Sequence, residues 1–527
     1  MKRPGMVLII VLVVVVMLSL AGLSFVMNMQ TEDKAARLQG RQLQVEHVVS
    51  SGAELVKAFC AQSWIDQQEA GGAWDNAEVF RDVLVLDDEA TGRRTRFSVV
   101  SPKAENAEVS GWRFGLENES AKLNLGILLH WEEREPGAAQ RALLALPGMT
   151  SAIADALLDW IDPDDASRSQ GAEAEYYRGL GVPYGPRNGV PQCLEELLLV
   201  RDVTRELVFG AAADLQHLSG LEGRDDRVGR RSSGLSVSDA PWASLLTVCS
   251  DERNETLNGR PRINVNLDNL PDLHQQLAAV LDRSWADFIV LYRQRGPYQS
   301  NASADTTTPA VNTTPAVNAN PAMNLSLPAK IPIGSLLDLV GAKVRLDSGD
   351  APPAEIMTSP LTTDPLSMRE SLPKLLDATT ITADPVIAGL VNVNLAARPV
   401  LLAVPGVDAV LADRLLAARG LRGQREDAAF HFPTWLLTEG LVDLPKMKAL
   451  LPYLTGGGDV ARAQLVGYDE QPGPTMRVEL VIDAAHTPPR QIYWKDLRLL
   501  TQGDVREMFG WETPVTARPT APRRGTR

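Results

Sequence analysis

The sequence opens with a short basic leader and an uninterrupted apolar run, MKRPG followed by MVLIIVLVVVVMLSLAGLSFVMNM, residues 1–29. The run from Met6 to Met29 holds 24 residues, and none of them is charged. About 20 apolar residues suffice for a helix to cross the hydrocarbon core of a bilayer. Lys2 and Arg3 precede the run, and such positive charge marks the cytoplasmic side. Since the run is longer than the apolar part of a usual signal peptide, we expect a retained single-pass anchor.

The junction between the leader and the apolar run resembles a type IV prepilin leader, because Gly5 stands directly before Met6. The resemblance implies that a prepilin peptidase cuts after Gly5 on the cytoplasmic side. Met6 would then be the mature N-terminus and would be N-methylated, and the apolar helix would remain. Most pilins carry Glu at the fifth mature position, whereas this chain has Ile10 there.

The helix is expected to continue past the membrane with one apolar stripe. Apolar residues and a glycine recur at a spacing of three to four, which is the period of a helix with one buried face. Polar residues surround them. The stripe consists of Val45, Val48, Val49, Gly52, Leu55, Val56 and Phe59. We therefore predict that this half of the helix lies on a sheet.

Strand candidates occur at both ends of the remaining chain, with a long, mostly helical region between them. Each candidate alternates in polarity or is rich in β-branched residues, and turn residues separate them. The ranges are 79–86, 94–100 and 111–116, and then 461–468, 476–482 and 491–497. This order predicts an α+β fold: a pilin-like long N-terminal helix and an antiparallel sheet that carries a large inserted α-helical domain.

The inserted region contains an internal repeat. An Asn set between apolar residues recurs at 122–125, 262–267 and 391–395, and the first and third copies lead to similar Pro-Gly turns. These turns, Pro147-Gly148 and Pro405-Gly406, join two apolar helical patterns each, where Pro ends one helix and Gly supplies the turn. The elements resemble SAM-like and helix-hairpin-helix modules.

Two stretches have the composition of disordered chain. Residues 299–329 hold one charge, no aromatic residue and a direct repeat of TTPAVN, and residues 512–527 are rich in Pro and Arg. The expected organisation is a leader (1–5), a transmembrane helix (6–29), a pilin-like helix with the first strands (30–120), an inserted helical domain (121–298), a linker (299–330), a second hairpin module (331–455), C-terminal strands (456–511) and a tail (512–527).

An acidic cluster follows the first hairpin, at residues 159–175. Its carboxylates repel one another unless water or a cation separates them, and hard oxygen ligands at short spacing suit Ca²⁺. The spacing is not that of an EF-hand, and a solvated loop in which an aspartate caps a helix is the simpler alternative. The candidate metal ligands are Asp159, Asp162, Asp164, Glu173 and Glu175.

The same region resembles the K pseudopilins of type II secretion, the general secretion pathway protein K family. The matching motifs occur in order: DWIDPD (159–164), GAE (171–173) with YY (176–177), PYGPRN (183–188), LEELLLV (194–200), LTV (246–248) and INVN (263–266). The resemblance implies a minor pseudopilin that caps the pseudopilus and holds calcium in the acidic loop. It also implies that Ile10 is the signature of a tip subunit. Residues 299–389 look like an insertion relative to the family.

The resemblance implies partners and a location as well. The partners would be the other minor pseudopilins, the major pseudopilin, prepilin peptidase, the inner-membrane secretion platform and secreted substrates. The location would be the bacterial inner membrane, with the bulk of the chain in the periplasm. Two alternatives stay open: a minor pilin of a type IV pilus, and a membrane-anchored helix-hairpin-helix receptor for DNA.

Composition argues against other classes. The formal net charge is −14, and residues 122–210 hold 8 Lys+Arg against 14 Asp+Glu, so a nucleic-acid phosphate backbone would be repelled. Thr150 and Asp408 replace the second glycine of a phosphate-binding hairpin. The histidines are scattered and no catalytic motif is present, so we expect no enzyme. The three cysteines have neither CxxC spacing nor a nearby His, which argues against a disulfide scaffold or a Cys-based zinc site and leaves one disulfide possible.

Overall fold

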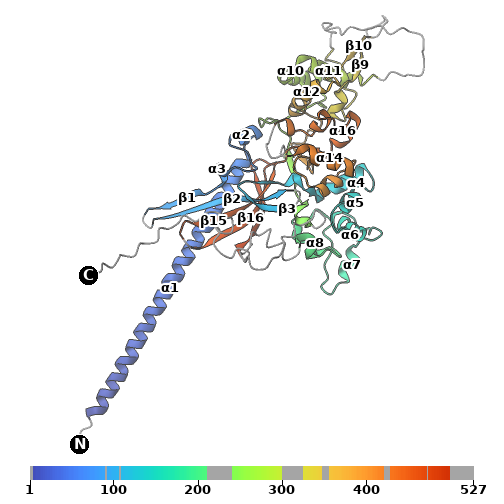
Figure 1. The fold of residues 1–527 in the computed structure, drawn as a ribbon. Helices are drawn as coiled ribbons and strands as arrows, with labels where there is room; N and C mark the ends of the chain where they lie inside the picture. Colours follow the sequence, from blue (N-terminus) through green and yellow to red (C-terminus); the bar gives the residue numbers. More distant parts are fainter. Residues whose placement is uncertain are drawn as a thin grey trace, which may run out of the picture.

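The computed structural model describes residues 4–89, 92–105, 108–210, 240–298, 324–346, 355–420, 428–471 and 473–498. Figure 1 shows three parts along the molecule: a projecting helix, a sheet packed on the end of that helix, and a body of short helices beyond the sheet. The expected tail and most of the expected linker lie outside the described residues.

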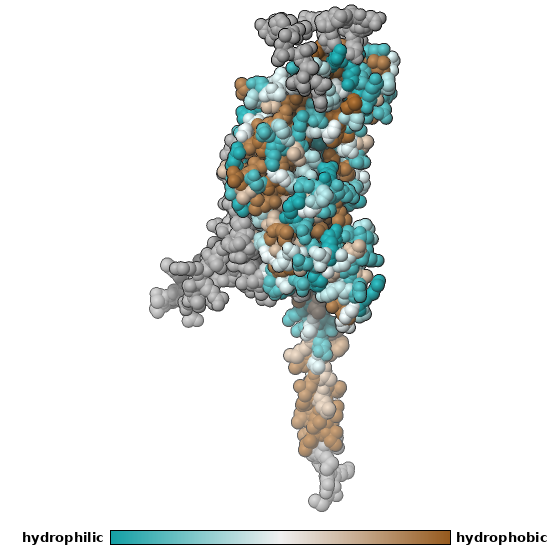
Figure 2. Space-filling view, turned by 90° about the vertical axis from the view of Figure 1, so that its right-hand side faces the viewer, coloured by the Kyte–Doolittle hydropathy of each residue, from teal (hydrophilic) through white to brown (hydrophobic). Residues whose placement is uncertain are grey.

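The N-terminal helix α1 (Pro4–Cys60) is continuous from the apolar run to the predicted stripe. Its described apolar residues from Leu8 to Met29 are exposed, and Figure 2 shows them as a hydrophobic stem below the body. Among the described residues, α1 is the one helix that is long and apolar enough to cross a membrane. Farther along, Val45, Val49 and Val56 are buried, which confirms the predicted stripe.

A seven-stranded sheet joins the two ends of the chain, as predicted. The main order is β1-β2-β15-β16-β17, all antiparallel, with β3 on β2 and β4 on β15. Leu465 of β15 faces Val99 of β2 across the join. The strands are β1 (Val83–Asp88), β2 (Arg93–Glu105), β3 (Glu108–Arg113), β4 (Glu117–Asn118), β15 (Val460–Asp469), β16 (Thr475–Asp483) and β17 (Arg490–Asp496). The structure thus confirms the pilin-like α+β fold.

Two glycines allow the helix to lie directly on this sheet. A Cβ at Gly52 of α1 would come within 2.9 Å of the Phe97 ring, and a Cβ at Gly467 of β15 would come within 2.5 Å of Val49. Such distances are too short for a side chain, so both positions need glycine. The helix and the sheet share one apolar core that includes Phe97, Leu465 and Val478.

The first predicted strand was placed too early. Residues 77–80 form a short helix, α3 (Ala77–Phe80), and β1 begins at Val83. The Asn76 side chain accepts a hydrogen bond from the N–H of Val79 at 3.2 Å, which caps this turn. A second short helix, α2 (Trp64–Glu69), follows α1. The apolar alternation at 79–86 looks like a strand throughout, but its first residues belong to the short helix that Asn76 caps.

In its described residues, the helical body consists of three units, and each is closed by a pair of two-residue parallel strands. The pairs are β5 (Leu123–Asn124) with β6 (Leu246–Thr247), β8 (Ile263–Asn264) with β11 (Thr379–Thr380), and β13 (Val391–Asn392) with β14 (Leu454–Thr455). The side chains of Asn124, Asn264 and Asn392 each accept a hydrogen bond from the N–H two residues later. The Asn repeat thus marks where each unit opens.

The third unit lies between the other two (Figure 1), since its α13 contacts α5 and its α15 contacts α12. The first unit holds α4 (Leu128–Arg134), α5 (Ala138–Leu144), α6 (Ser151–Ile161), α7 (Ala174–Arg178) and α8 (Arg205–Phe209). The second holds α10 (Leu270–Val280), α11 (Arg283–Arg295), α12 (Pro365–Ala378) and the strands β9 (Lys343–Leu346) and β10 (Glu355–Thr358). The third holds α13 (Arg398–Ala403), α14 (Ala409–Arg419), α15 (Trp435–Thr438) and α16 (Leu444–Leu450), and β7 (Asp251–Arg253) pairs with β12 (Val386–Ala388) between units.

Candidate functional site

The acidic loop extends from the C-terminal end of α6, the second helix of the first hairpin. Gly148 adopts a φ of 69° in the turn between α5 and α6, which the Pro-Gly pair predicts. The Thr150 hydroxyl then accepts a hydrogen bond from the N–H of Ile153 at 3.3 Å and caps α6. The hairpin therefore fixes the direction in which α6 delivers its acidic residues.

Three aspartates share one face of this end of α6, because Asp155, Asp159 and Asp162 are four and three positions apart. All three are buried. Asp155, which was not among the predicted ligands, accepts hydrogen bonds from the Gln140 amide at 2.6 Å and from the N–H of Gln170 at 3.1 Å. Its spacing from Asp159 on the helix was the signal that could have identified it.

The loop carries its own counter-ion, Arg168. Its Nη1 donates to Asp159 Oδ1 at 2.7 Å and also to Asp162 Oδ2, and its backbone N–H donates to Asp159. Asp159 is fully buried, so an unpaired charge there would cost several kcal/mol. The guanidinium therefore occupies the space between these two carboxylates.

Glu173, by contrast, is buried and forms no ion pair with any described Lys or Arg side chain. Neither of its carboxylate oxygens accepts a well-formed hydrogen bond from the described residues, and the Oδ1 atom of Asp162 is in the same state. Burial, and then the charges of Asp159, Asp162 and Asp165, raise the pKa of Glu173 to about 7, which the N–H of Ala174 opposes. Burial also raises the pKa of Asp162, although Arg168 counteracts it. The loop thus holds more buried negative charge than Arg168 neutralises.

The five predicted ligands do not all lie together. Asp159, Asp162 and Glu173 are buried close enough to perturb one another, whereas Asp164 and Glu175 are exposed. Asp164 Oδ1 accepts a hydrogen bond from the N–H of Ala166 at 2.8 Å, so it stabilises the turn of the loop. The structure places Glu175 on the outer side of α7.

Backbone contacts hold the return of the loop against α6. A Cβ at Gly171 would come within 1.8 Å of Asp159 Oδ2, so only glycine fits beside that carboxylate. Arg201 donates to the carbonyl oxygen of Gly171 at 2.9 Å and also to that of Gln170. Its guanidinium lies 5.4 Å from the centre of the Tyr176 ring. These contacts therefore anchor the returning end of the loop.

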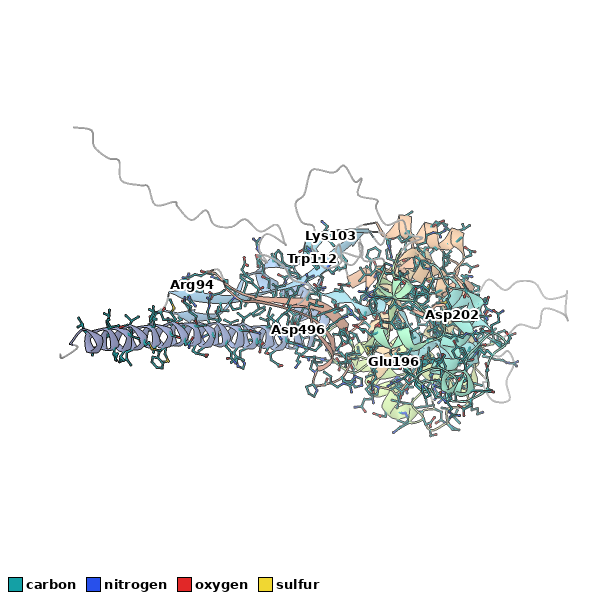
Figure 3. The ribbon with its side chains drawn as sticks, turned by 90° about the horizontal axis from the view of Figure 1, so that it is seen from below. Arg94, Lys103, Trp112, Glu196, Asp202 and Asp496 are labelled. Carbon is teal, nitrogen blue, oxygen red and sulfur yellow. The ribbon has the colours of Figure 1, made fainter. Side chains whose placement is uncertain are left out.

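A cluster of aromatic side chains packs beside the two ends of the loop. The Trp160 ring meets the Tyr177 ring edge to face at 5.3 Å, and Tyr184 lies 5.2 Å from Tyr177. Trp160 Nε1 donates to Glu196 Oε1 at 3.1 Å; Figure 3 shows Glu196 in the helical body. The aromatic residues of the DWIDPD, YY and PYGPRN motifs therefore pack on one another and hold the segments that flank the loop.

The loop offers the oxygen donors that a hard divalent cation takes, but the donor atoms of Asp159, Asp162 and Glu173 do not converge within 4.8 Å of one another while Arg168 bridges the two aspartates. Buried carboxylate oxygens that lack hydrogen-bond donors are costly, and a cation with oxygen ligands would satisfy them. Both oxygens of Glu173 and the Oδ1 atom of Asp162 are such oxygens, whereas the oxygens of Asp159 already accept hydrogen bonds from Arg168. Asp164 and Glu175 are exposed at the rim. A bound Ca²⁺ would neutralise the charge that Arg168 leaves.

The predicted processing site lies at the start of α1, whose first described residue is Pro4. Gly5 and Met6 have helical backbone, and Ile10 is exposed on the apolar part of the helix. The helix therefore begins within the leader and continues through the junction.

The hairpin helices have no free N-terminal site for a phosphate. The Asp408 carboxylate accepts a hydrogen bond from the N–H of Leu411 at 2.8 Å, and Thr150 occupies the equivalent place on α6. A carboxylate at this position repels a phosphate. In the structure the two hairpins pack on each other through α13 and α5.

Comparisons with known proteins agree with the sequence motifs. Residues 121–210, which include the acidic loop, match the family model described as type II secretion system (T2SS), protein K. No curated protein matches the chain. A solved chain in the crystal structure of the GspK-GspI-GspJ complex from the enterotoxigenic Escherichia coli type 2 secretion system is 12% identical, and the alignment covers 88% of this chain and 98% of that one at a TM-score of 0.33. A likeness this low carries no argument about function. Residues 121–210 of the chain are therefore similar to the protein K family of type II secretion.

Proposed function

We propose that this chain is a minor pseudopilin of type II secretion that caps the tip of the pseudopilus, primes its assembly and so supports protein export across the outer membrane. The observation that carries the proposal is the form of the molecule. The helical body lies beyond the sheet, at the end opposite the exposed part of α1 (Figures 1 and 3). In a filament whose subunits pack by their N-terminal helices, this body occupies the space that the next subunit would need.

The apolar helix supports the same position. A carboxylate at the centre of a membrane helix costs about 2.5–3.5 kcal/mol on insertion scales unless it is paired. A subunit inside a filament recovers this cost when a neighbour's terminal amine pairs with the acid. Ile10 stands where that acid would be, which suits a subunit that lacks a neighbour on one side.

The proposal includes partners and an orientation. On the order of its sequence motifs, we propose the other minor pseudopilins as partners of this chain. The major pseudopilin, prepilin peptidase, the inner-membrane secretion platform and secreted substrates complete the expected set. The N-terminus would be cytoplasmic and the sheet and helical body periplasmic. The chain would act through assembly and would catalyse no reaction.

We also propose that the loop at 159–175 holds one structural Ca²⁺. Asp159, Asp162 and Glu173 would be the inner ligands, and Asp164 and Glu175 would complete the site at the rim. The unsatisfied buried oxygens of Glu173 and Asp162 support this assignment. The ion would lock the loop onto α6 and so make the first helical unit rigid.

Replacing Gly5 by Val should leave the leader uncut, because the peptidase must accommodate the residue before the cut. The measurement is mass spectrometry of the N-terminal peptide from membranes of cells that also express a prepilin peptidase. The parent should yield a peptide that starts at Met6 and is one methyl group heavier. Gly22→Ala, a change in open space on the same helix, should be processed normally. Normal processing of Gly5→Val would contradict the prepilin assignment.

Replacing Ile10 by Glu should not improve assembly if the chain is a tip subunit. We expect Ile10→Glu and the control Val13→Glu to reduce incorporation into pseudopili alike, because both place an unpaired acid in lipid. Incorporation is measured by immunoblotting of sheared filaments against membranes. Retention of Ile10→Glu along the filament, together with loss of Val13→Glu, would indicate an internal subunit and contradict the tip position.

A further inference from the structure

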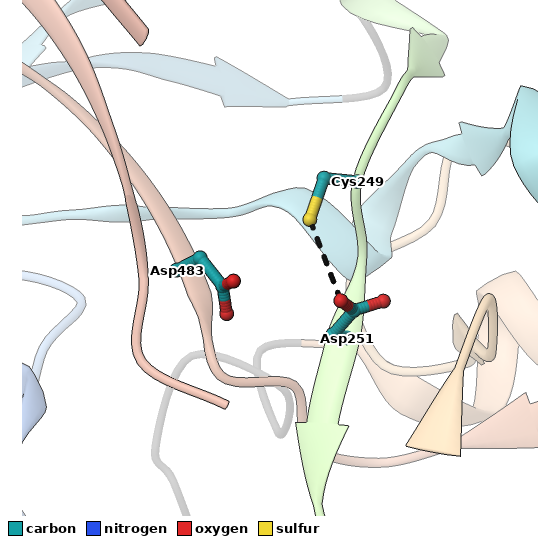
Figure 4. A group of neighbouring side chains, drawn as sticks. All are labelled: Cys249, Asp251 and Asp483. Atoms are coloured by element: carbon teal, nitrogen blue, oxygen red, sulfur yellow. Dashed lines mark hydrogen bonds between the residues drawn. The ribbon is translucent and has the colours of Figure 1, made fainter. Parts of the chain in front are cut away.

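A second group of metal-ligating side chains lies outside the acidic loop, where the helical body joins the sheet. Cys249, Asp251 and Asp483 point toward one another (Figure 4), and one donor atom of each lies within 4.8 Å of the other two. Cys249 Sγ donates to Asp251 Oδ2 at 3.7 Å. Cys249 lies between β6 and β7, Asp251 opens β7, and Asp483 ends β16. The group thus combines two segments that are more than 200 residues apart.

The groups around this cluster leave an excess of negative charge. Asp483 is almost fully buried and contacts the Arg490 Nη2 at 2.6 Å and the His486 Nδ1 at 2.9 Å. Burial, and then the charges of Asp251 and Asp483, raise the pKa of the Cys249 thiol well above its usual range. The carboxylates of Asp251 and Asp483 therefore share the single permanent charge of Arg490. A divalent cation would balance that difference.

We propose that this cluster is a zinc site, in which Cys249 Sγ and the carboxylates of Asp251 and Asp483 bind one Zn²⁺. A thiolate among carboxylates selects zinc over calcium or magnesium, which take oxygen ligands. Binding transfers the thiol proton to solvent and leaves a Zn–S bond. His486 contacts Asp483 and orients that ligand, as outer partners of metal sites do. The fourth position of the tetrahedron is left to water.

The position of the site gives the ion a structural role. The backbone oxygen of Asp251 accepts a hydrogen bond from the N–H of Asp459, just before β15, at 3.0 Å. Strand β7 therefore lies against the start of β15, and Asp483 lies at the end of the neighbouring strand β16. A metal bound here would hold β7, which connects the first two helical units, against the pilin-like sheet. The inference depends neither on the calcium loop nor on the proposed tip function.

The sequence argued against a Cys-based zinc site because Cys249 has no partner cysteine or histidine at the usual spacing. That argument considered only neighbours in the chain. Asp483 reaches the cysteine through the pairing of β15 with β16 and the return of the chain from the helical body, and His486 contacts Asp483 there. Spacing alone therefore could not reveal the site.

The test is a cobalt titration of the purified full chain in detergent, after treatment with a chelator and a reductant. Co²⁺ replaces Zn²⁺ in such sites, and a thiolate ligand produces a sulfur-to-cobalt charge-transfer band in the near ultraviolet. We expect one equivalent of Co²⁺ to give this band and Zn²⁺ to abolish it. Cys249→Ser should lose the band, while Cys193→Ser, which alters another partly exposed thiol, should keep it.

Carboxylate variants keep the test decisive if the serine variant folds poorly. Asp251→Asn retains the thiol and should weaken Co²⁺ binding at least tenfold, whereas Glu173→Gln in the acidic loop should leave the band unchanged. Circular dichroism reports whether each variant is folded. The absence of a band in the parent, a band that survives in folded Cys249→Ser, or unchanged affinity in folded Asp251→Asn would each overturn the zinc site.

Discussion

Calcium should raise the melting temperature of the full chain, and Glu173→Gln should abolish that rise. A ligand that binds only the folded state at one hundred times its Kd stabilises it by about 2.7 kcal/mol. Both oxygens of Glu173 are buried without well-formed hydrogen bonds, so they have the most to gain from an ion. In the absence of calcium, Glu173→Gln should melt at or above the parent, because it removes an unpaired buried charge.

Differential scanning calorimetry in detergent, with calcium or with a chelator, measures both effects. The double change Asp162→Ala with Asp164→Ala should also lose the calcium response. Asp202→Asn, which alters an exposed acid of the same unit outside the loop (Figure 3), should retain it. A parent whose melting temperature does not respond to calcium would exclude the ion, and a full response in Glu173→Gln would exclude that ligand.

Replacing Glu119 by Gln should destabilise the folded chain by about 3–5 kcal/mol, the cost of removing one member of a buried ion pair. Glu119 is fully buried; its Oε1 accepts from Lys122 Nζ at 2.7 Å and from Arg462 Nε at 2.8 Å. The Thr247 hydroxyl donates to its other oxygen. The variant leaves the buried Lys122 and the partly buried Arg462 without the acid that they share, although Arg462 keeps its ion pair with Glu479. Because Arg462 is on β15 and Thr247 is on β6, the cluster joins the sheet to the first helical unit.

The effect of Glu119→Gln should depend on pH. Burial alone would raise the pKa of Glu119, but Arg462 and Lys122 outweigh it and hold that pKa well below its usual value of 4.5. A carboxyl with a lowered pKa in the folded state stabilises the protein fully above its unfolded pKa, and this stabilisation is lost as the pH falls. The difference in unfolding free energy between parent and variant should therefore be constant above about pH 5.5 and shrink below about pH 4.5.

The matched control is Glu54→Gln, which breaks an exposed ion pair with Lys57 and should cost less than about 1 kcal/mol. Unfolding followed by circular dichroism in increasing denaturant, at pH 7 and pH 4, gives both free energies. Equal losses for Glu119→Gln and Glu54→Gln would show that the buried cluster contributes no more than a surface pair.

The acidic loop shows how far the residues alone could define the site. The crowding of carboxylates at 159–175 predicted a cation, but it could not separate the buried acids from the exposed ones. That division depends on α6, whose 3.6-residue period turns Asp155, Asp159 and Asp162 to one side, and on Gly171, which lets the chain return against Asp159. The counter-ion role of Arg168 was also invisible, because only the folded loop brings its guanidinium to both aspartates.

The sequence by itself determined the features that depend on local patterns. A run of 24 uncharged residues, an apolar stripe at helical spacing and alternating strands specify the membrane helix, the helix face and the sheet, because hydrophobic burial follows those periods wherever they occur. The tertiary structure decided what depends on contacts between distant segments: the parallel strands that close each helical unit, the Glu119 cluster, and the meeting of Cys249 with Asp483. Such contacts arise from the packing of whole elements, and no spacing along the chain encodes the distance between them.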